Sequence, residues 1–244
     1  ALTAAGEAGA PDLLQGFRQV NGAVEKMRAA TRRRRLIVSV EPSFATAWLV
    51  PRLERFRQAC PEVDVLIDSS LQIVDLAGGA ADVAVRFAAT PDRALVTERL
   101  FDEELCALCS PALAAAAGLT RLADLERVTL LHWDLGHLPW ASGTRRWMEW
   151  SRWLGHAGAG EARPGEGLRF TDYNLALQAA IAGQGVILAS WPILRHLVAA
   201  GLLTDPFGAR VETDIGYDLV TTERARERPE VGSFLAWIAG EARG

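Results

Sequence analysis

Hydroxyl groups beside predicted helix starts are the side chains of this chain best suited to binding chemistry. Ser43 follows the apolar run at residues 36–40 and precedes an amphipathic helix that ends before Pro61. A hydroxyl and the free N–H groups of a helix N-terminus can hold an oxyanion, although the same serine can simply cap its helix. Ser69 and Ser70 end the next strand, at the edge where α/β sheets place ligands. This strand–helix–strand unit predicts a site for a small polar or anionic molecule.

Catalytic and metal-binding signatures are missing from the sequence. It contains no G-x-S-x-G, H-E-x-x-H or phosphate-binding loop, and the four histidines are scattered without carboxylates at ligand spacing. Cys106 and Cys109 form a C-x-x-C within the apolar run LCALC, which reads as a strand. A spacing of three on a strand points side chains to opposite faces, which favours core thiols over a redox or metal pair. We therefore expect no enzyme activity, no cofactor and no metal.

Composition limits the class of protein further. The chain has 244 residues, of which 50% are hydrophobic, and a formal net charge of -4. That balance argues against a nucleic-acid surface on this piece alone. No apolar run reaches the ~20 residues of a membrane span, no signal segment stands at the start, and three cysteines suit a reducing compartment. We expect a cytoplasmic globular protein without a membrane partner.

The elements that must position the hydroxyls alternate as in an α/β fold. Strands are predicted at residues 36–40, after Pro61 as far as Ser69 and Ser70, and at residues 82–87, 95–100, 105–110, 128–133, 168–170, 185–190 and 215–222, with helices between them. Extended crossings near 103–110 and 203–207 would divide the chain into two lobes. A helix at 142–154 carries Trp147, Trp150 and Trp153, and their spacing favours the buried face of the helix over an aromatic cage.

The first 35 residues differ from the rest. Residues 11–29 show a narrow apolar stripe at helical spacing, too thin for a large core but suited to pairing with another helix. The arginine run at 31–35 could touch phosphate or form a solvated hinge, and the pattern favours the hinge.

Several of these motifs resemble one known family. V-x-P-S-F-A at residues 40–45, W-L-V-P-R-L-x-R-F at 48–56, I-D-S-S at 67–70 and the L-T-x-A-G start at 2–6 resemble LysR-type bacterial transcriptional regulators. The likeness is to their effector-binding domain, in particular in the subgroup of the glycine-cleavage activator and the β-lactamase regulators. It implies an α/β fold with two Rossmann-like lobes of type 2 periplasmic-binding-protein architecture, preceded by a linker helix. It also implies that a helix-turn-helix domain lies upstream and is absent from this chain.

The resemblance implies domain boundaries and a ligand cleft between the lobes. It assigns 1–34 to the linker, 35–104 with 206–244 to lobe I, and 105–205 to lobe II. With Ser43, Ser69 and Ser70, the expected effector-binding residues are Phe44, Asp75, Trp133, Thr171, Asp172, Tyr173 and Tyr217. Core packing for Phe44 and helix capping for Asp75, Thr171 or Asp172 remain open alternatives.

The expected function is ligand sensing. A small-molecule effector would bind between the lobes, and the change would reach DNA only through the missing N-terminal domain. The resemblance implies a homodimer or homotetramer formed through the linker helix and the lobes. The alternative is a solute-binding protein of a transporter, which shares the two-lobed architecture. The expected pocket residues include no arginine or lysine, so a strongly anionic ligand is not required.

Overall fold

The computed structural model describes residues 34–87, 94–138, 146–160 and 167–243, together with Thr3, Gly9, Gly16, Asp92 and Ala141. The predicted linker helix at 11–29 lies outside these residues apart from Gly16. Most of the arginine run at 31–35 and of the L-T-x-A-G start also lies outside them.

A single eight-stranded sheet runs through the protein in the order β2-β1-β3-β8-β4-β7-β5-β6. The pairs β1–β2, β1–β3, β5–β6 and β5–β7 are parallel, whereas β8 and β4 pair antiparallel to each other and to their outer neighbours. The strands are β1 (Arg34–Val40), β2 (Val63–Ser69), β3 (Val83–Phe87), β4 (Val96–Leu108), β5 (Leu130–Trp133), β6 (Gly167–Phe170), β7 (Val186–Ser190) and β8 (Val211–Thr221).

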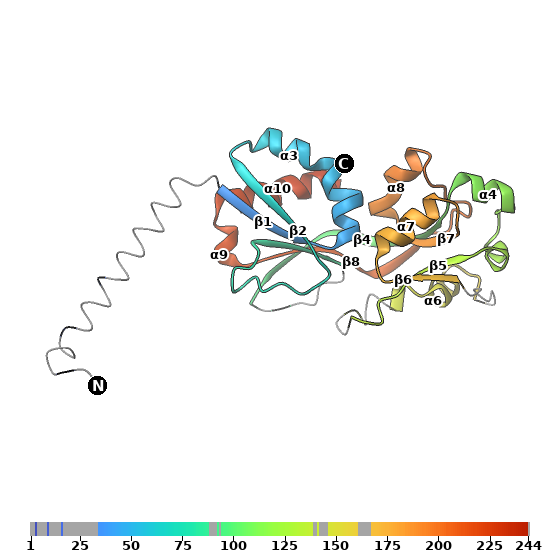
Figure 1. The fold of residues 1–244 in the computed structure, drawn as a ribbon, viewed down its shortest axis with the longest axis horizontal. Helices are drawn as coiled ribbons and strands as arrows, with labels where there is room; N and C mark the ends of the chain where they lie inside the picture. Colours follow the sequence, from blue (N-terminus) through green and yellow to red (C-terminus); the bar gives the residue numbers. More distant parts are fainter. Residues whose placement is uncertain are drawn as a thin grey trace.

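The helical elements gather around the two ends of this sheet. Figure 1 shows α3, α9 and α10 with β1 and β2 at one end, and α4, α6, α7 and α8 with β5, β6 and β7 at the other. β4 and β8 run between the two groups. The helical elements are α2 (Pro42–Phe44), η1 (Ala45–Leu49), η2 (Val50–Arg52), α3 (Leu53–Ala59), α4 (Pro111–Ala117), η3 (Leu122–Arg127), α6 (Trp150–His156), α7 (Tyr173–Ile181), α8 (Trp191–Ala199), α9 (Glu223–Arg226) and α10 (Pro229–Arg243).

The predicted strand–helix–strand unit is confirmed. A helical path runs from Pro42 to Ala59 between β1 and β2, and it changes hydrogen-bond type around Pro51, which lacks a donor N–H. Its inward face buries Phe44, Trp48, Leu49 and Phe56. The Phe56 ring meets Phe234 of α10 edge to face at 5.5 Å, so the C-terminal helix covers the helix of this unit.

The crossing between the lobes differs from the prediction. The strands predicted at 95–100 and 105–110 form one strand, β4, which pairs with β8 along most of its length. Two register shifts interrupt this pair, between Arg99 and Phe101 and between Asp102 and Glu104. β8 pairs with both β3 and β4, and within the predicted return crossing at 203–207 Thr204 forms a bridge with Cys109. The domain boundaries themselves stay a prediction.

The tryptophan segment is buried, as predicted, but it is not one helix. Met148 and Glu149 are not helical, and α6 begins at Trp150. Trp147, Trp150 and Trp153 are all buried. The indole N–H of Trp150 donates to the Leu131 carbonyl at 3.2 Å and that of Trp153 to the Leu105 carbonyl at 3.1 Å. Because these bonds tie the segment to the sheet, the aromatic rings serve as core.

Cys106 and Cys109 are core thiols, as their spacing on a predicted strand indicated. Cys106 and Cys109 are free and fully buried, and Cys60 is free and half-buried. Among the described residues, no helix combines the length and the hydropathy that a bilayer crossing requires.

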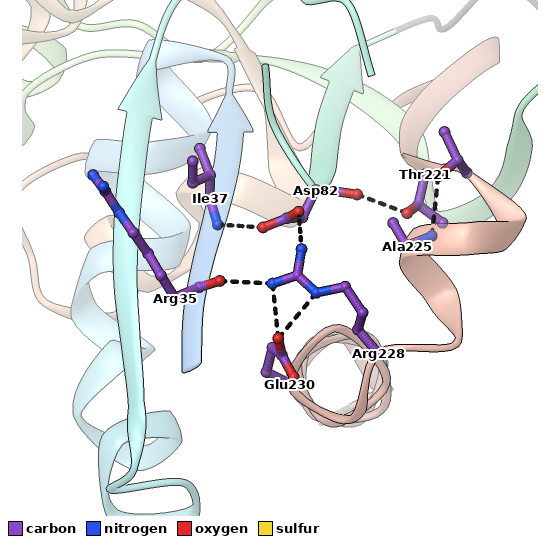
Figure 2. Close-up of polar contacts among 8 residues, drawn as sticks. Arg35, Ile37, Asp82, Thr221, Ala225, Arg228 and Glu230 are labelled. Carbon is purple, nitrogen blue, oxygen red and sulfur yellow. Dashed lines mark hydrogen bonds and ion pairs between the residues drawn. The ribbon is translucent and has the colours of Figure 1, made fainter. Parts of the chain in front are cut away.

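A polar cluster joins the start of β1 to the C-terminal helices (Figure 2). The Arg228 guanidinium forms an ion pair with Asp82, donates to the Arg35 carbonyl at 2.8 Å and contacts Glu230 at 2.7 Å. Asp82 in turn accepts from the Ile37 N–H at 2.9 Å. The cluster therefore holds together the first residues of β1, the residue before β3, and α10.

Candidate functional site

Two adjoining pockets lie between the halves of the sheet and share Phe87 and Trp133. The first is lined by Glu41, Ser70, Leu71, Arg86, Phe87, Trp133 and Leu135. The second is lined by Ser43, Phe87, Glu103, Leu105, Trp133, Met148, Tyr173, Ser190, Ile193 and Tyr217. Their walls come from the segments that follow β1 and β2, from β3, β8 and the first helix on one side, and from β5, α7, β7 and α8 on the other. β4 contributes Glu103 and Leu105 to the second pocket. Five of the predicted residues meet here: Ser43, Ser70, Trp133, Tyr173 and Tyr217.

The start of the first helix is capped by Glu41, not by Ser43. The Glu41 carboxylate accepts from the backbone N–H groups of Ser43 at 3.0 Å and Phe44 at 2.8 Å. It also accepts from the Ser43 hydroxyl at 2.5 Å. The donors predicted to hold an oxyanion are therefore already bound to a carboxylate of the same chain. Pro42 at the first helical position explains the shift, because it makes the preceding residue the N-cap.

Burial has the largest effect on the pKa of the Glu41 carboxyl group. It raises the pKa of the carboxyl above its ordinary value, and the hydrogen bonds from Ser43 and Phe44 oppose that rise only in part. Asp172 adds a smaller rise in the pKa through its negative charge. The pocket wall at this helix start is thus an acidic group and not a free anion site.

Aromatic rings form most of the remaining wall. Trp133 and Tyr173 meet edge to face at 5.2 Å, and the Tyr173 hydroxyl donates to the Leu188 carbonyl at 3.0 Å. Tyr217 of β8 stacks between Phe44 at 5.2 Å and Phe87 at 4.9 Å. Packing on both sides fixes these rings, so the pocket has rigid apolar walls.

Arg86 is a charged residue that sequence reasoning missed. It extends from β3 into the first pocket, and its guanidinium donates to the Ser39 hydroxyl at 2.7 Å, the Ser39 carbonyl at 3.0 Å and the Gln72 carbonyl at 3.2 Å. Burial lowers its pKa, while Asp68 and Glu41 act in the opposite direction. The expectation that no cation lines the pocket is therefore wrong.

Glu103 and Ser190 are two further residues that the sequence did not single out. Glu103 lies on β4 and Ser190 ends β7, and both side chains are buried on the wall of the second pocket. An acid within the alternating pattern of a strand is usually solvent-facing, which is why Glu103 escaped notice. Burial raises its pKa to about 8, although the neighbouring Ser190 hydroxyl acts to lower it.

The other five predicted residues do not line either pocket. Phe44 is buried in the aromatic cluster, and Ser69 is exposed at the end of β2. Exposed Asp75 accepts from the Gly78 N–H at 2.8 Å and so caps a turn. Asp172 caps α7 through the Asn174 N–H at 2.8 Å, and the Thr171 carbonyl accepts from the Trp133 indole at 3.4 Å. As effector contacts, all five stay predictions.

A metal site is not visible in the part of the chain that the structure describes. There, no three histidine, cysteine, aspartate or glutamate side chains gather closely enough to bind an ion. Two half-sheets with a small aromatic and polar pocket between them define a ligand-binding protein of two lobes.

Comparison with known proteins identifies the family. The LysR substrate binding domain matches residues 29–243. The glycine cleavage system transcriptional activator of Escherichia coli K12 is 32% identical over 242 residues, covering 99% of this chain and 76% of that protein. The transcriptional activator AmpR of Yersinia enterocolitica is 28% identical over 241 residues, covering 98% and 77%. The chain belongs to the LysR family and contains its substrate-binding domain.

Solved structures agree with this assignment. The effector domain of AmpR from Pseudomonas aeruginosa superposes with a TM-score of 0.69 at 29% identity, over 86% of this chain and 96% of that one. CrgA, a LysR-type regulator from Neisseria meningitidis, superposes with a TM-score of 0.71 at 17% identity, which shows the fold alone. The predicted two-lobed, periplasmic-binding-protein-like fold is confirmed. The chain is a ligand-sensing regulatory domain, and the relatives give the transporter alternative no support.

Proposed function

We propose that this regulatory domain binds a small-molecule effector in the two adjoining pockets and that Ser43, Ser70, Trp133, Tyr173 and Tyr217 contact it. The proposal depends on one observation: the residues that line the pocket come from both halves of the sheet. Tyr217 and Ser43 come from one half of the sheet, Trp133 and Tyr173 from the other, and all but Ser70 line one pocket. A ligand that touches both halves favours one arrangement of the lobes over another, which is the requirement for a sensor.

The proposal extends to partners. We infer that the protein assembles as a dimer or tetramer through the linker and the lobes, and that it reaches DNA through a separate N-terminal domain. Support comes from its relatives, which are transcriptional activators. Light scattering on a sizing column should report a dimer or tetramer of this chain, whereas a monomer at micromolar concentration would contradict the assembly.

Effector binding is tested by a thermal-shift screen of metabolites followed by calorimetry. Compounds that bind should bind Ser43→Ala about tenfold more weakly, because the Ser43 oxygen, whose hydrogen is donated to Glu41, can still accept a hydrogen bond from the ligand worth ~1.5 kcal/mol or more. Ser151→Ala is the matched control, since it makes the same change on the exposed face of α6. Its affinity should equal that of the unaltered protein.

Two outcomes would count against the proposal. Equal affinity of Ser43→Ala for every ligand would remove Ser43 from the site. Binding that survives both Ser43→Ala and Trp133→Ala would place the effector elsewhere, because Trp133 lines both pockets.

A further inference from the structure

Glu103 is the most unusual polar side chain in the described part of the protein. The residue is 2% exposed, and neither carboxyl oxygen makes a well-formed hydrogen bond to a described group. The Ser190 hydroxyl is 8% exposed and lies near enough to lower the pKa of Glu103, but it too makes no well-formed hydrogen bond. Burying a carboxyl group without compensation is costly, so an unsatisfied pair on a pocket wall indicates a ligand that completes it.

The surroundings of Glu103 favour a cation as that ligand group. The described residues that line its pocket include no arginine, lysine or histidine, so no side chain there neutralises the acid. Four aromatic side chains, Phe87, Trp133, Tyr173 and Tyr217, line the same pocket. Aromatic faces carry negative potential and attract ammonium groups. Both neighbours along the chain, Asp102 and Glu104, are also acids, and the charge of Glu104 raises the pKa of Glu103 slightly further.

The backbone position of Glu103 links this group to the lobes. Glu103 lies within the register shift between Asp102 and Glu104, in the strand that crosses from one lobe to the other. An irregularity of this kind re-aims a side chain out of the regular alternation. Thr213 of β8 holds the site in place through a hydrogen bond of 3.0 Å to the Glu103 carbonyl. A ligand bound to Glu103 therefore contacts the crossing strand directly.

We propose that Glu103 and Ser190 together recognise a protonated amino group, and that the effector is a small amine or amino acid. This inference rests on the proposed effector site and names the chemical class that it takes. The ammonium group would donate to the Glu103 carboxylate and to the Ser190 hydroxyl, and the aromatic rings would enclose it.

The ionisation of Glu103 adds a second signature. Its pKa of about 8 keeps the carboxyl largely protonated at neutral pH. An ammonium group favours the charged carboxylate, so binding should release about one proton near pH 7. Affinity for an amine should rise between about pH 6 and pH 8, because less work is then needed to ionise the acid.

The experiment compares matched compounds on the intact chain by calorimetry. The probes are alanine with lactate, serine with glycerate, putrescine with 1,4-butanediol, and a metabolite screen that contains amines and amine-free acids. We expect the binders to carry an amino group and their hydroxyl analogues to bind at least tenfold more weakly. Glu103→Gln should weaken the amine binders by about tenfold or more and abolish proton release, and Ser190→Ala should weaken them several-fold.

Glu104→Gln is the matched control, because it makes the same change one residue along, at a half-buried acid that pairs with Arg210 at 3.8 Å. Its affinities should stay within about twofold of the unaltered protein. Thermal unfolding of each variant checks that the fold is intact.

The outcomes separate this inference from the proposed function. Amine-free binders that need Ser43 and Trp133 but not Glu103 would overturn the amine proposal and leave the effector site standing. An equal loss of amine and amine-free binders in Glu103→Gln would show a merely structural role and also overturn it. If no compound of either kind binds, both proposals fail.

Discussion

Glu41 and Glu103 are both buried acids on pocket walls, yet their surroundings differ. Glu41 accepts three hydrogen bonds from the helix that it caps, whereas Glu103 makes no well-formed hydrogen bond to the described residues. Burial raises the pKa of both. Glu41 therefore serves the local structure, while Glu103 weakens the folded state in a way that a bound ligand can reverse.

The raised pKa of Glu103 in the folded protein predicts a specific dependence of stability on pH. Its pKa of about 8 lies above the ordinary value of 4.5, so the folded protein keeps a proton that the unfolded chain loses between those values. The unfolded state then binds fewer protons, and the free energy of unfolding falls as pH rises, by at most ~1.4 kcal/mol per pH unit. Glu103→Gln cannot ionise, so its stability relative to the unaltered protein should increase from about pH 5 to about pH 8.

Urea unfolding at several pH values measures this difference, with Glu104→Gln as the control. A stability difference between Glu103→Gln and the unaltered protein that does not change with pH would show that Glu103 is ionised in the fold.

At the scale of single residues, the sequence predicted where the helix starts but assigned its cap to the wrong side chain. Ser43 matches the cap pattern, and the position of Pro42 was the signal that Glu41 is the true N-cap. Arg86 could not be recognised because it is a lone charge in a strand, and Glu103 because it stands between two other acids, Asp102 and Glu104. Which face of a strand is buried depends on neighbours that are distant in the sequence.

Among the elements, α10 depends on the polar cluster around Arg228. Replacing Arg228 with methionine should lower the free energy of unfolding by ~1–3 kcal/mol, because it removes the cation from Asp82 and Glu230 and a donor from the Arg35 carbonyl. The side chain is 40% exposed, which keeps the expected loss moderate.

Arg224→Met is the control for this cluster, since Arg224 is exposed on α9. Denaturant unfolding should give a clearly lower free energy of unfolding for Arg228→Met than for Arg224→Met. Equal stabilities would mean that the cluster contributes nothing to holding α10 on the sheet.

The order of the elements could be predicted because strands and helices alternate with distinct hydrophobic periods. The length of β4 could not be predicted, because the polar residues 102–104 interrupt its apolar pattern and make one strand look like two. The helix predicted at 142–154 was wrong at residues 148–149, which lie between two indoles that bond to Asp214 and to the Leu131 carbonyl.

On the scale of the whole molecule, the buried thiols of Cys106 and Cys109 report whether the sheet around β4 stays closed. Burial raises the pKa of Cys109 to about 11 and that of Cys106 well above its ordinary value. Only Cys60 is partly accessible. Ellman's reagent near pH 8 should therefore react with one thiol of the folded protein and with all three after unfolding in guanidinium chloride.

Cys60→Ser provides the control, because its folded form should show almost no reaction. Rapid reaction of a second thiol under native conditions would mean that the sheet opens at β4 without global unfolding.

The two-lobed architecture could be predicted from the family resemblance, because that resemblance depends on motifs spread along the chain. The pocket contents could not be predicted in the same way, since they combine side chains that are up to about 170 residues apart in the sequence, such as Ser43 and Tyr217.

The path of β8 has a consequence for the protein during synthesis. β3 pairs with β8, and β8 is translated more than 100 residues later. Strands β5, β6 and β7 are all complete before β8 emerges from the ribosome. The second lobe can therefore gather its own strands first, while β3 waits with an open edge that can pair with another nascent chain. We expect chains truncated before Val211 to aggregate, because the strand that closes the sheet is nearly the last to be made.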